Sequence, residues 1–558
     1  MLPHISLFNM LLPAAAEKTA HRWLTILPAL LGWLAWIPIG ITPLLFVMFV
    51  PLLYLSEIAA KGSKTLGGGW LFYRVFGCFL LFNLFTTDWI AGATWVGMLF
   101  AVVTNALLMC VPFMLFFQTL NRLGGRVGYL SFILYWLAFE HLHQRWELAW
   151  TWLNLGNALS AYPSFIQWYA YTGSGGGTLW VLLVNMLVFR AFMQYWGMGK
   201  WAQTLGKNQT SGRVFLPSAL VFMVPILLSL GMFYTYTETG KPVEVVIVQP
   251  SENPYHIPTE QEANEQVQKM LALAQKQLTP NTQYLLLPET ALPDAFWIDG
   301  FTQHPRTKQL RQWLQQYPQL KIISGITALQ HYPQPGATPT ARSYLSKSGS
   351  YDVYNSSAQI DTGIGVQFYH KSKLVPGVER IPYQSVFGLL SPLAEALGGG
   401  IGSFGSQPEC GVFTANGGFA IAPVICYESV FGQYVTRYVK KGAQLLFIMT
   451  NDGWWGNTAG YQQHLHYASM RAIETRRSIA RAANTGISAF IDQRGRRTKT
   501  LAWQQTDALR HTLLANDRLT FYAQYGDYLG RTAVLLSGLL LLLTFVGKFT
   551  THHTQKIT

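Results

Sequence analysis

The chain has 558 residues, of which 50% are hydrophobic and only 12% are charged, and its formal net charge is +14. An ordinary soluble domain carries about 25% charged residues, so this composition excludes a fully soluble globule and a disordered chain. A small disulfide-rich scaffold is excluded as well, because the whole chain contains only four cysteines. The composition fits a membrane protein with several spans and a large polar segment.

Eight apolar runs are long enough to cross a bilayer, which takes about 20 residues per helix. They lie at residues 23–40, 41–58, 70–88, 92–121, 127–142, 175–195, 213–235 and 531–549. Only a Gly/Pro break at 40–43 separates the first two runs, so a hairpin is expected there. No basic residue precedes Lys18, which favours an interfacial N-terminal segment over a cleavable signal peptide.

Lysine and arginine gather in every second connection between these runs. The basic connections contain Lys18, Arg22, Lys61, Lys64, Arg74, Arg122, Arg126, Arg190, Lys200, Lys207, Arg213, Lys548 and Lys556. The positive-inside rule therefore predicts that both termini are cytoplasmic and that segment 236–530 lies outside the cytoplasm. Positive loops and anionic lipid surfaces explain the net charge, so no nucleic-acid partner is expected.

These patterns predict three parts of the chain. Residues 1–235 form a transmembrane region with seven helices, and residues 531–558 form the last transmembrane helix and a cytoplasmic tail. Segment 236–530 alternates strand-like with helix-like runs, which is typical of an α/β domain. Its predicted strands are 243–249, 284–287, 320–327, 419–425 and 443–450, and its predicted helices are 260–278, 307–316, 429–441 and 462–477.

Polar residues directly follow three of the predicted strands, at Glu289, at Cys426 and at 451–456. Ligands of α/β folds lie at the carboxyl ends of strands, so these positions are the first candidates for a functional site. Cys426 also precedes a predicted helix, whose free N–H groups would favour a thiolate and lower the thiol pKa. Two alternatives remain open for it: an inert buried cysteine and a Cys410–Cys426 disulfide.

The remaining candidate chemistry comes from single side chains that, taken one at a time, are more often ordinary surface or packing residues. A buried Glu289 would be a usable general base, and Lys371 would place positive charge next to an oxyanion. Lys373 would point the same way as Lys371 in a strand. A Cys–His pair of papain type is the competing chemistry, with His370, His464 and His466 as candidate bases. Cys78 and Cys110 lie in apolar runs and are interpreted as packing residues. The sequence contains no CxxC motif, so a zinc site is not expected.

Taken together, Glu289, Lys371 and Cys426 resemble, in order and context, the Glu–Lys–Cys triad of the nitrilase (carbon–nitrogen hydrolase) superfamily. Longer motifs resemble the apolipoprotein N-acyltransferase family within it, over nearly the whole chain. These motifs are 287–293, 371–379, 426–428, 451–456, 463–465, 470–474 and 484–488, together with Glu140, Arg145 and 152–156 in the membrane part. One departure is 376–379, which reads Pro-Gly-Val-Glu where that family usually has Pro-Phe-Gly-Glu.

The resemblance implies an eight-helix transmembrane bundle with a nitrilase-like αββα sandwich domain, placed in the bacterial inner membrane with the catalytic domain in the periplasm. It implies an acyltransferase that carries an acyl chain from a phospholipid, phosphatidylethanolamine, to the N-terminal amine of diacylglyceryl-cysteine on apolipoproteins. That transfer is the last step of lipoprotein maturation, and it passes through a thioester on Cys426, which must then be a free thiol.

The resemblance also assigns roles to single residues. Glu289 would be the base, and Lys371 with the N–H of Tyr427 would stabilise the oxyanion. Supporting roles fall to Glu379, Tyr427, Glu428 and Trp454, and neither a metal nor a cofactor is required.

Two other functions remain open on the sequence. A membrane-tethered amidase would use the same triad on a small amide, because fold and triad do not determine the substrate. A non-catalytic membrane scaffold with an inactive nitrilase-like domain is the second alternative. The intact set of Glu289, Lys371 and Cys426 argues against it.

Overall fold

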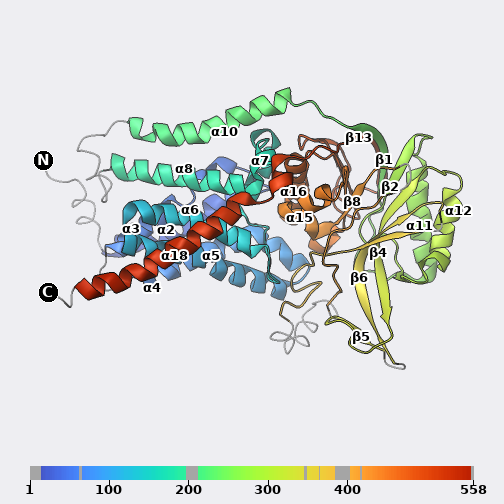
Figure 1. The fold of residues 1–558 in the computed structure, drawn as a ribbon, viewed down its shortest axis with the longest axis horizontal. Coiled ribbons are helices and arrows are strands. Elements are labelled where there is room, and N and C mark those ends of the chain that lie inside the picture. Colours follow the sequence, from blue (N-terminus) through green and yellow to red (C-terminus); the bar gives the residue numbers. More distant parts are fainter. Residues whose placement is uncertain are drawn as a thin grey trace.

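The computed structural model describes residues 14–61, 66–196, 212–344, 348–363, 365–383, 403–414 and 418–554. Figure 1 shows two halves, a bundle of long helices and a half built from β-sheets with helices on their outer faces. The last helix leads back from the sheet half and ends at the far end of the bundle. The large polar segment is therefore inserted between two parts of one helical bundle.

Eight helical segments of the bundle overlap the predicted spans, with the largest offset at the first. They are α2 (Ala14–Ala35), η1 (Thr42–Val47) with α3 (Val50–Ala60), α4 (Gly68–Thr87), α5 (Trp95–Leu123), α6 (Gly125–His143), α8 (Ser174–Tyr195), α10 (Leu216–Thr235) and α18 (Tyr528–Thr554). Within the described residues, six of these segments are long and apolar enough to cross a membrane, and α2 and α6 are the two that are not. Spanning by α2 and α6 therefore stays a prediction.

The orientation of the bundle also stays a prediction. Four of the basic residues used in the charge argument lie outside the described residues, and so does the expected interfacial segment before Ala14. The four are Lys64, Lys200, Lys207 and Lys556.

The sheet half contains two sheets. The first has the strand order β13-β1-β2-β4-β6-β5, with β3 beside β4 and β7 beside β6. Its strands are β1 (Lys241–Gln249), β2 (Thr282–Leu286), β3 (Ala295–Trp297), β4 (Lys321–Tyr332), β5 (Arg342–Ser343), β6 (Ser350–Ile360), β7 (Gln367–His370) and β13 (Asp507–Ala515). The second sheet has the order β12-β11-β10-β9-β8, from β8 (Ile421–Ile425), β9 (Leu445–Thr450), β10 (Ile479–Ala483), β11 (Ala489–Ile491) and β12 (Arg497–Thr500).

Alternate side chains of β1 face two different hydrophobic cores, as the two-residue period of a strand requires. Val246 and Val248 pack with buried residues of α11 (Glu260–Gln275) and α12 (Pro305–Leu314), whereas Val245 and Ile247 pack with residues of the second sheet. The helices α15 (Gly432–Lys440) and α16 (Ala459–Thr475) lie beyond the second sheet (Figure 1). The resulting order of helix, sheet, sheet and helix is the αββα architecture that the resemblance implied.

The predicted central strands are confirmed to within a few residues, but one predicted helix begins in the wrong place. Residues 429–441 do not form one helix, because the chain first makes the 3-10 turn η8 (Cys426–Val430), and α15 begins at Gly432. The strands β3, β5, β6, β7 and β10 to β13 were not predicted.

The helix α16 attaches the sheet half to the bundle through a buried amide. Gln463 accepts hydrogen bonds from the indole N–H groups of Trp89, at 3.2 Å, and Trp152, at 2.6 Å. Its own NH₂ group donates to the carbonyl oxygens of Ile37, at 2.8 Å, and Thr86, at 3.2 Å. One side chain of the sheet half is thus fully hydrogen-bonded by residues of the helical half.

Candidate active site

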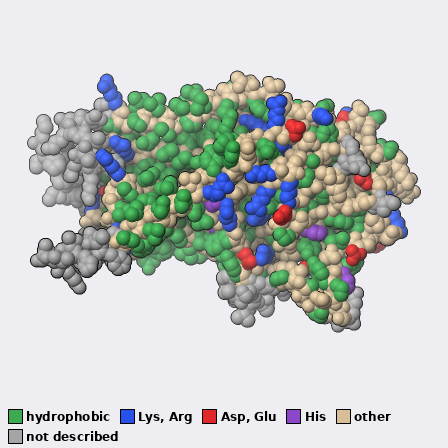
Figure 2. Space-filling view, in the orientation of Figure 1, with side chains coloured by type: hydrophobic (Ala, Val, Ile, Leu, Met, Phe, Trp, Pro, Cys, Tyr) green, Lys and Arg blue, Asp and Glu red, His purple; other side chains and the backbone are tan. Residues whose placement is uncertain are grey.

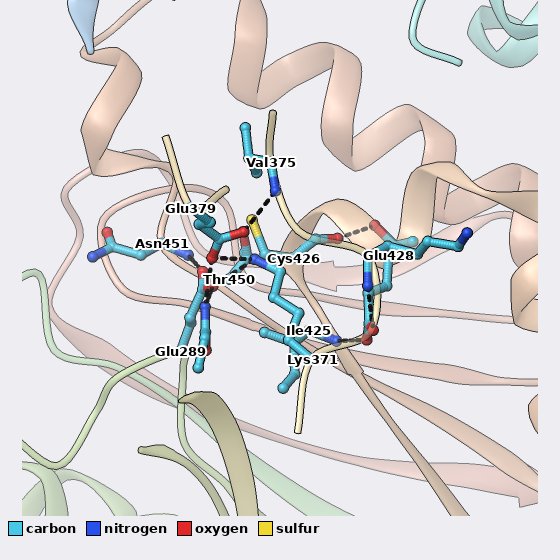
Figure 3. Close-up of polar contacts among 12 residues, drawn as sticks. Glu289, Lys371, Val375, Glu379, Ile425, Cys426, Glu428, Thr450 and Asn451 are labelled. Carbon is cyan, nitrogen blue, oxygen red and sulfur yellow. Dashed lines mark hydrogen bonds and ion pairs between the residues drawn. The ribbon is translucent and has the colours of Figure 1, made fainter. Parts of the chain in front are cut away.

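Three strand ends bring Glu289, Lys371 and Cys426 together in the sheet half. Glu289 follows β2, Lys371 follows β7 and Cys426 follows β8, and all three side chains are buried. Figure 3 shows the sulfur of Cys426 beside the Lys371 ammonium and the carboxylates of Glu379 and Glu289. The structure therefore assembles the residues that the sequence singled out.

Lys371 lies between two carboxylates. Its Nζ is 3.3 Å from Oε1 of Glu289 and 2.8 Å from Oε1 of Glu379. Burial disfavours the ammonium form, but the two carboxylates outweigh burial and raise the pKa of Lys371 above its ordinary value. The side chain is therefore a buried cation with a fixed position.

Hydrogen bonds also hold both carboxylates in place. Nδ2 of Asn355, in β6, donates to Oε1 of Glu289 at 2.7 Å and to Oε1 of Glu379 at 2.9 Å. The second oxygen of each carboxylate accepts a backbone N–H, from Asn451 at 2.9 Å for Glu289 and from Val375 at 2.8 Å for Glu379. Both acids are consequently oriented before any substrate arrives.

Cys426 has an unusual backbone conformation and a thiol whose pKa is raised. Its φ of +47° lies in the left-handed region, which residues other than glycine rarely adopt. Burial raises the pKa of the thiol, the charge of Glu289 raises it further, and Lys371 only partly opposes them. The expectation of a lowered thiol pKa was wrong, because the chain turns through η8 before α15 begins and the thiol is buried beside a carboxylate. A nucleophilic Cys426 consequently needs a base.

We expect the alkylation of Cys426 to follow this raised pKa. Its rate with iodoacetamide should keep rising between pH 7 and pH 10, because the thiolate fraction grows tenfold per pH unit below the pKa. Peptide-resolved mass spectrometry would measure the rate at Cys426 separately from the other thiols. A rate that levels off below pH 8 would show a resting thiolate and contradict the structure.

A buried network of polar side chains holds the backbone of Cys426. The Cys426 carbonyl accepts hydrogen bonds from Oγ of Ser429, at 2.7 Å, and lies 3.1 Å from Nε2 of His464. Nδ1 of His464 lies 3.0 Å from Asp452, which also accepts a bond of 2.7 Å from Arg481. This network fixes the backbone of the strained turn at Cys426.

None of the candidate histidines bonds to the thiol among the described residues. His370 is bonded to Ser356, and His466 lies 3.1 Å from the carbonyl oxygen of Ser160. The geometry therefore does not support a papain-type Cys–His pair. Cys410 and Cys426 are both free thiols, so the disulfide alternative was wrong as well.

The predicted supporting residues lie in different places. Glu379 belongs to the cluster around Lys371, whereas the Tyr427 hydroxyl donates to the carbonyl of Ala149 in the helical half, at 2.9 Å. Trp454 is 41% exposed and packs against Tyr255, so the structure does not place it in the cluster.

Glu428 is fully buried and connects the two turns of the site. It accepts backbone N–H groups from Ser372 at 2.7 Å and from Ile425 at 3.0 Å. The hydroxyl groups of Tyr369 and Tyr438 also donate to it, at 2.6 and 3.0 Å. Because Ser372 follows Lys371 and Ile425 precedes Cys426, Glu428 fixes the position of Lys371 relative to Cys426.

Sequence reasoning missed Asn355, although this residue bonds to both carboxylates. The only sequence feature that could have identified it was one amide in the run of small and apolar residues at 353–358, in a strand that was not predicted.

We expect Asn355→Leu to lower kcat on the order of tenfold, because two hydrogen bonds that orient the acids are lost. The KM for the substrate should stay within twofold, and a change confined to KM in steady-state kinetics would contradict this role.

Two apolar hollows lie in the bundle, and the smaller one reaches the loop that carries Glu379. The first has a volume of about 80 Å³ and lies between the loop that carries Glu379 and the bundle. The second has a volume of about 590 Å³ and is lined by residues of α5, α6 and α18. Leu108 and His143 line both hollows, so the two are neighbours.

Comparisons with known families divide the chain as the fold does. The carbon–nitrogen hydrolase family model matches residues 246–517, and the model of the apolipoprotein N-acyltransferase N-terminal domain matches residues 28–187. The second match ends before the sheet half begins, so each half of the chain has its own family match.

Whole-length relatives combine both halves. An apolipoprotein N-acyltransferase of Chlorobaculum tepidum is 28% identical over 523 residues, which cover 92% of this chain and 94% of that protein. One of Thermotoga maritima is 25% identical over 399 residues, covering 72% of this chain and 67% of the relative. Among solved structures, Nit3 of Saccharomyces cerevisiae, a member of the nitrilase superfamily, aligns at 15% identity and a TM-score of 0.35, over 50% of this chain and 92% of that one.

Proposed function

Because the chain belongs to the apolipoprotein N-acyltransferase family of the carbon–nitrogen hydrolases, we propose that it N-acylates lipoproteins in a bacterial membrane. The acyl donor is a phospholipid, phosphatidylethanolamine, and the acceptor is the free amine of a diacylglyceryl-cysteine at a lipoprotein N-terminus. The observation that carries this proposal is a buried Glu289–Lys371–Cys426 cluster whose Glu379 loop borders an apolar hollow of the bundle. A site of that kind suits a lipid ester.

The first half of the reaction acylates Cys426. The thiol gives its proton to Glu289, whose two oxygens already have fixed partners, and the sulfur attacks the ester carbonyl carbon of the donor. The ester C–O bond then breaks, and the departing alkoxide of the lysophospholipid takes the proton back from Glu289. A thioester remains on Cys426.

Lys371 and the backbone N–H of Tyr427 stabilise the tetrahedral oxyanion in both halves of the reaction. Lys371 is suited to this role because its ammonium group is held charged by two carboxylates and needs no reorganisation. Glu379 keeps the ammonium group in position and does not itself transfer the proton.

The second half forms the amide. The lipoprotein amine attacks the thioester carbonyl, Glu289 accepts the proton that the amine loses, and the C–S bond breaks. The sulfur leaves as a thiolate that Glu289 protonates, which regenerates the raised-pKa thiol of the resting site. In this reaction the chain's own side chains perform every proton transfer.

Mass spectrometry of the purified protein after incubation with phosphatidylethanolamine tests the proposal. We expect an acyl-sized mass increase on the peptide containing Cys426, which hydroxylamine removes and a diacylglyceryl-cysteine peptide discharges. An unmodified Cys426 with release of ammonia from small amides would instead indicate the amidase. If neither the phospholipid nor the small amides react, the non-catalytic scaffold would be the remaining alternative.

A further inference from the structure

Three cations that the mechanism does not use converge next to the active site. The ammonium of Lys373 lies 5.3 Å from the ring centre of Phe431 and 5.6 Å from that of Tyr434. The guanidinium of Arg437 lies 5.8 Å from the same Tyr434 ring, and Arg145 donates to Gln433 at 3.4 Å. The three positive groups thus gather around one turn of α15 and the turn before it.

None of these cations forms an ion pair within the described part of the chain. None of the sixteen ion pairs found there includes Lys373, Arg437 or Arg145. The nearby carboxylate of Glu428 accepts the backbone N–H of Lys373 rather than its ammonium group. Burial lowers the pKa of Lys373, and the charges of Arg437 and Arg145 lower it further, whereas the charge of Glu428 only partly opposes them. Like charges held together in this way favour an anion between them.

We propose that Lys373, Arg437 and Arg145 bind the phosphate group of the phospholipid donor, an inference that rests on the proposed acyl transfer. Arginine and lysine are the side chains that most often bind phosphate. Cation–π contacts hold the Lys373 ammonium and the Arg437 guanidinium near the Tyr434 ring. This phosphate site does not include Lys371, whose ammonium group forms ion pairs with the carboxylates of Glu289 and Glu379.

The position of the cluster favours a lipid phosphate over a free one. Arg145 follows the end of α6, and its neighbour Trp146 lines the apolar groove between α5, α6 and α18. Figure 2 shows Lys and Arg side chains gathered where the sheet half meets the largely hydrophobic surface of the helical half. A phosphate at this height would leave the acyl chains of the same molecule facing the bundle.

The cluster also lies at a suitable place relative to the nucleophile. Lys373 is two residues from Lys371, which places their Cα atoms at most about 7 Å apart. Glu428 bonds both the turn of Lys373 and the strand end before Cys426, so the spacing is fixed. In a phospholipid the phosphate and the sn-1 ester occupy the two ends of one glycerol unit, which matches a phosphate site and a thiol on adjacent turns.

Steady-state acylation kinetics with Lys373→Gln/Arg437→Gln test this proposal. We expect the KM for phosphatidylethanolamine in mixed micelles to rise at least about tenfold, because two charge-assisted contacts are lost, with kcat within twofold of the unchanged protein. Acylation of Cys426 by a phosphate-free p-nitrophenyl ester should keep its rate. Lys308→Gln, which removes one exposed charge from the distant helix α12, should leave every constant unchanged.

Three results would overturn the proposal. They are an unchanged KM for the phospholipid, an equal loss with the phosphate-free ester, and inorganic phosphate binding that the variant loses without any change in donor KM. The last result would identify a free-phosphate site. Native mass spectrometry of retained phospholipid reports binding without turnover, so a phosphate site would be seen even if the acyl transfer itself failed.

Discussion

Replacing Cys426 with alanine is expected to abolish acyl transfer, with a loss of about 10⁴-fold or more, the scale seen when a catalytic nucleophile is removed. No thioester can form without the sulfur, and no other thiol lies in the cluster, since the remaining cysteines are buried elsewhere. Transfer of a radiolabelled or fluorescent acyl chain to a diacylglyceryl-cysteine peptide would measure the loss. Cys426→Ser should be equally inactive, because Glu289 would have to ionise a far weaker acid.

Cys410→Ala is the matched control for this experiment. Cys410 is also a buried free thiol of the sheet half, and its loss should leave the transfer rate within twofold. The covalent mechanism would be wrong if Cys426→Ala kept more than a few per cent of the activity, or if both variants lost it equally.

Lys371→Met should have the second-largest effect, a fall in kcat of about 10²- to 10³-fold, the scale of removing one oxyanion donor. The variant should also be less stable, because the carboxylates of Glu289 and Glu379 would be left buried without their cation. Steady-state kinetics and the thermal midpoint in detergent would measure the two effects.

In the unchanged protein the raised pKa of Lys371 acts on stability in the alkaline range. Its contribution is fully present below the ordinary lysine pKa of about 10.4 and is lost as the pH rises through the folded value.

Lys441→Met is a suitable control because this lysine is exposed, and among the described residues its ammonium group bonds only to the Glu409 carboxylate and the Cys410 carbonyl, neither of which belongs to the cluster around Lys371. It should leave kcat, KM and the thermal midpoint nearly unchanged, as surface ion pairs contribute little. A Lys371→Met enzyme with kcat within tenfold of the unchanged protein would exclude Lys371 as the oxyanion donor.

The parts of the fold that the sequence predicted are those with a long, uniform signal. The apolar helices and the buried strands β1, β8 and β9 have unbroken runs of hydrophobic residues, which identify them without any tertiary information. Strand β6 has a mixed run of Ser, Asn, Tyr and Val, because its side chains meet polar groups of the site as well as the cores. Local patterns do not predict such a strand.

The candidate site divides in the same way. Glu289 and Cys426 could be found because each follows a predicted strand and belongs to a recognisable motif, whereas Lys371 could be found from its motif alone. Asn355 and the network behind Cys426 depend on which chain segments meet in space. The thiol pKa was wrong for a related reason, since it depends on burial and on Glu289, which is 137 positions away in the chain.

The buried amide of Gln463 has a consequence for how this enzyme can be studied. A truncated fragment of residues 236–530 would expose that side chain and leave its four hydrogen bonds to be replaced by water. It would also strip Tyr467 of its bonds to Trp36 and to the carbonyl of Trp152. The sheet half is therefore not expected to fold independently of the helical half. Because α16 is hydrogen-bonded to the helical bundle, we expect the two halves to unfold in a single cooperative transition.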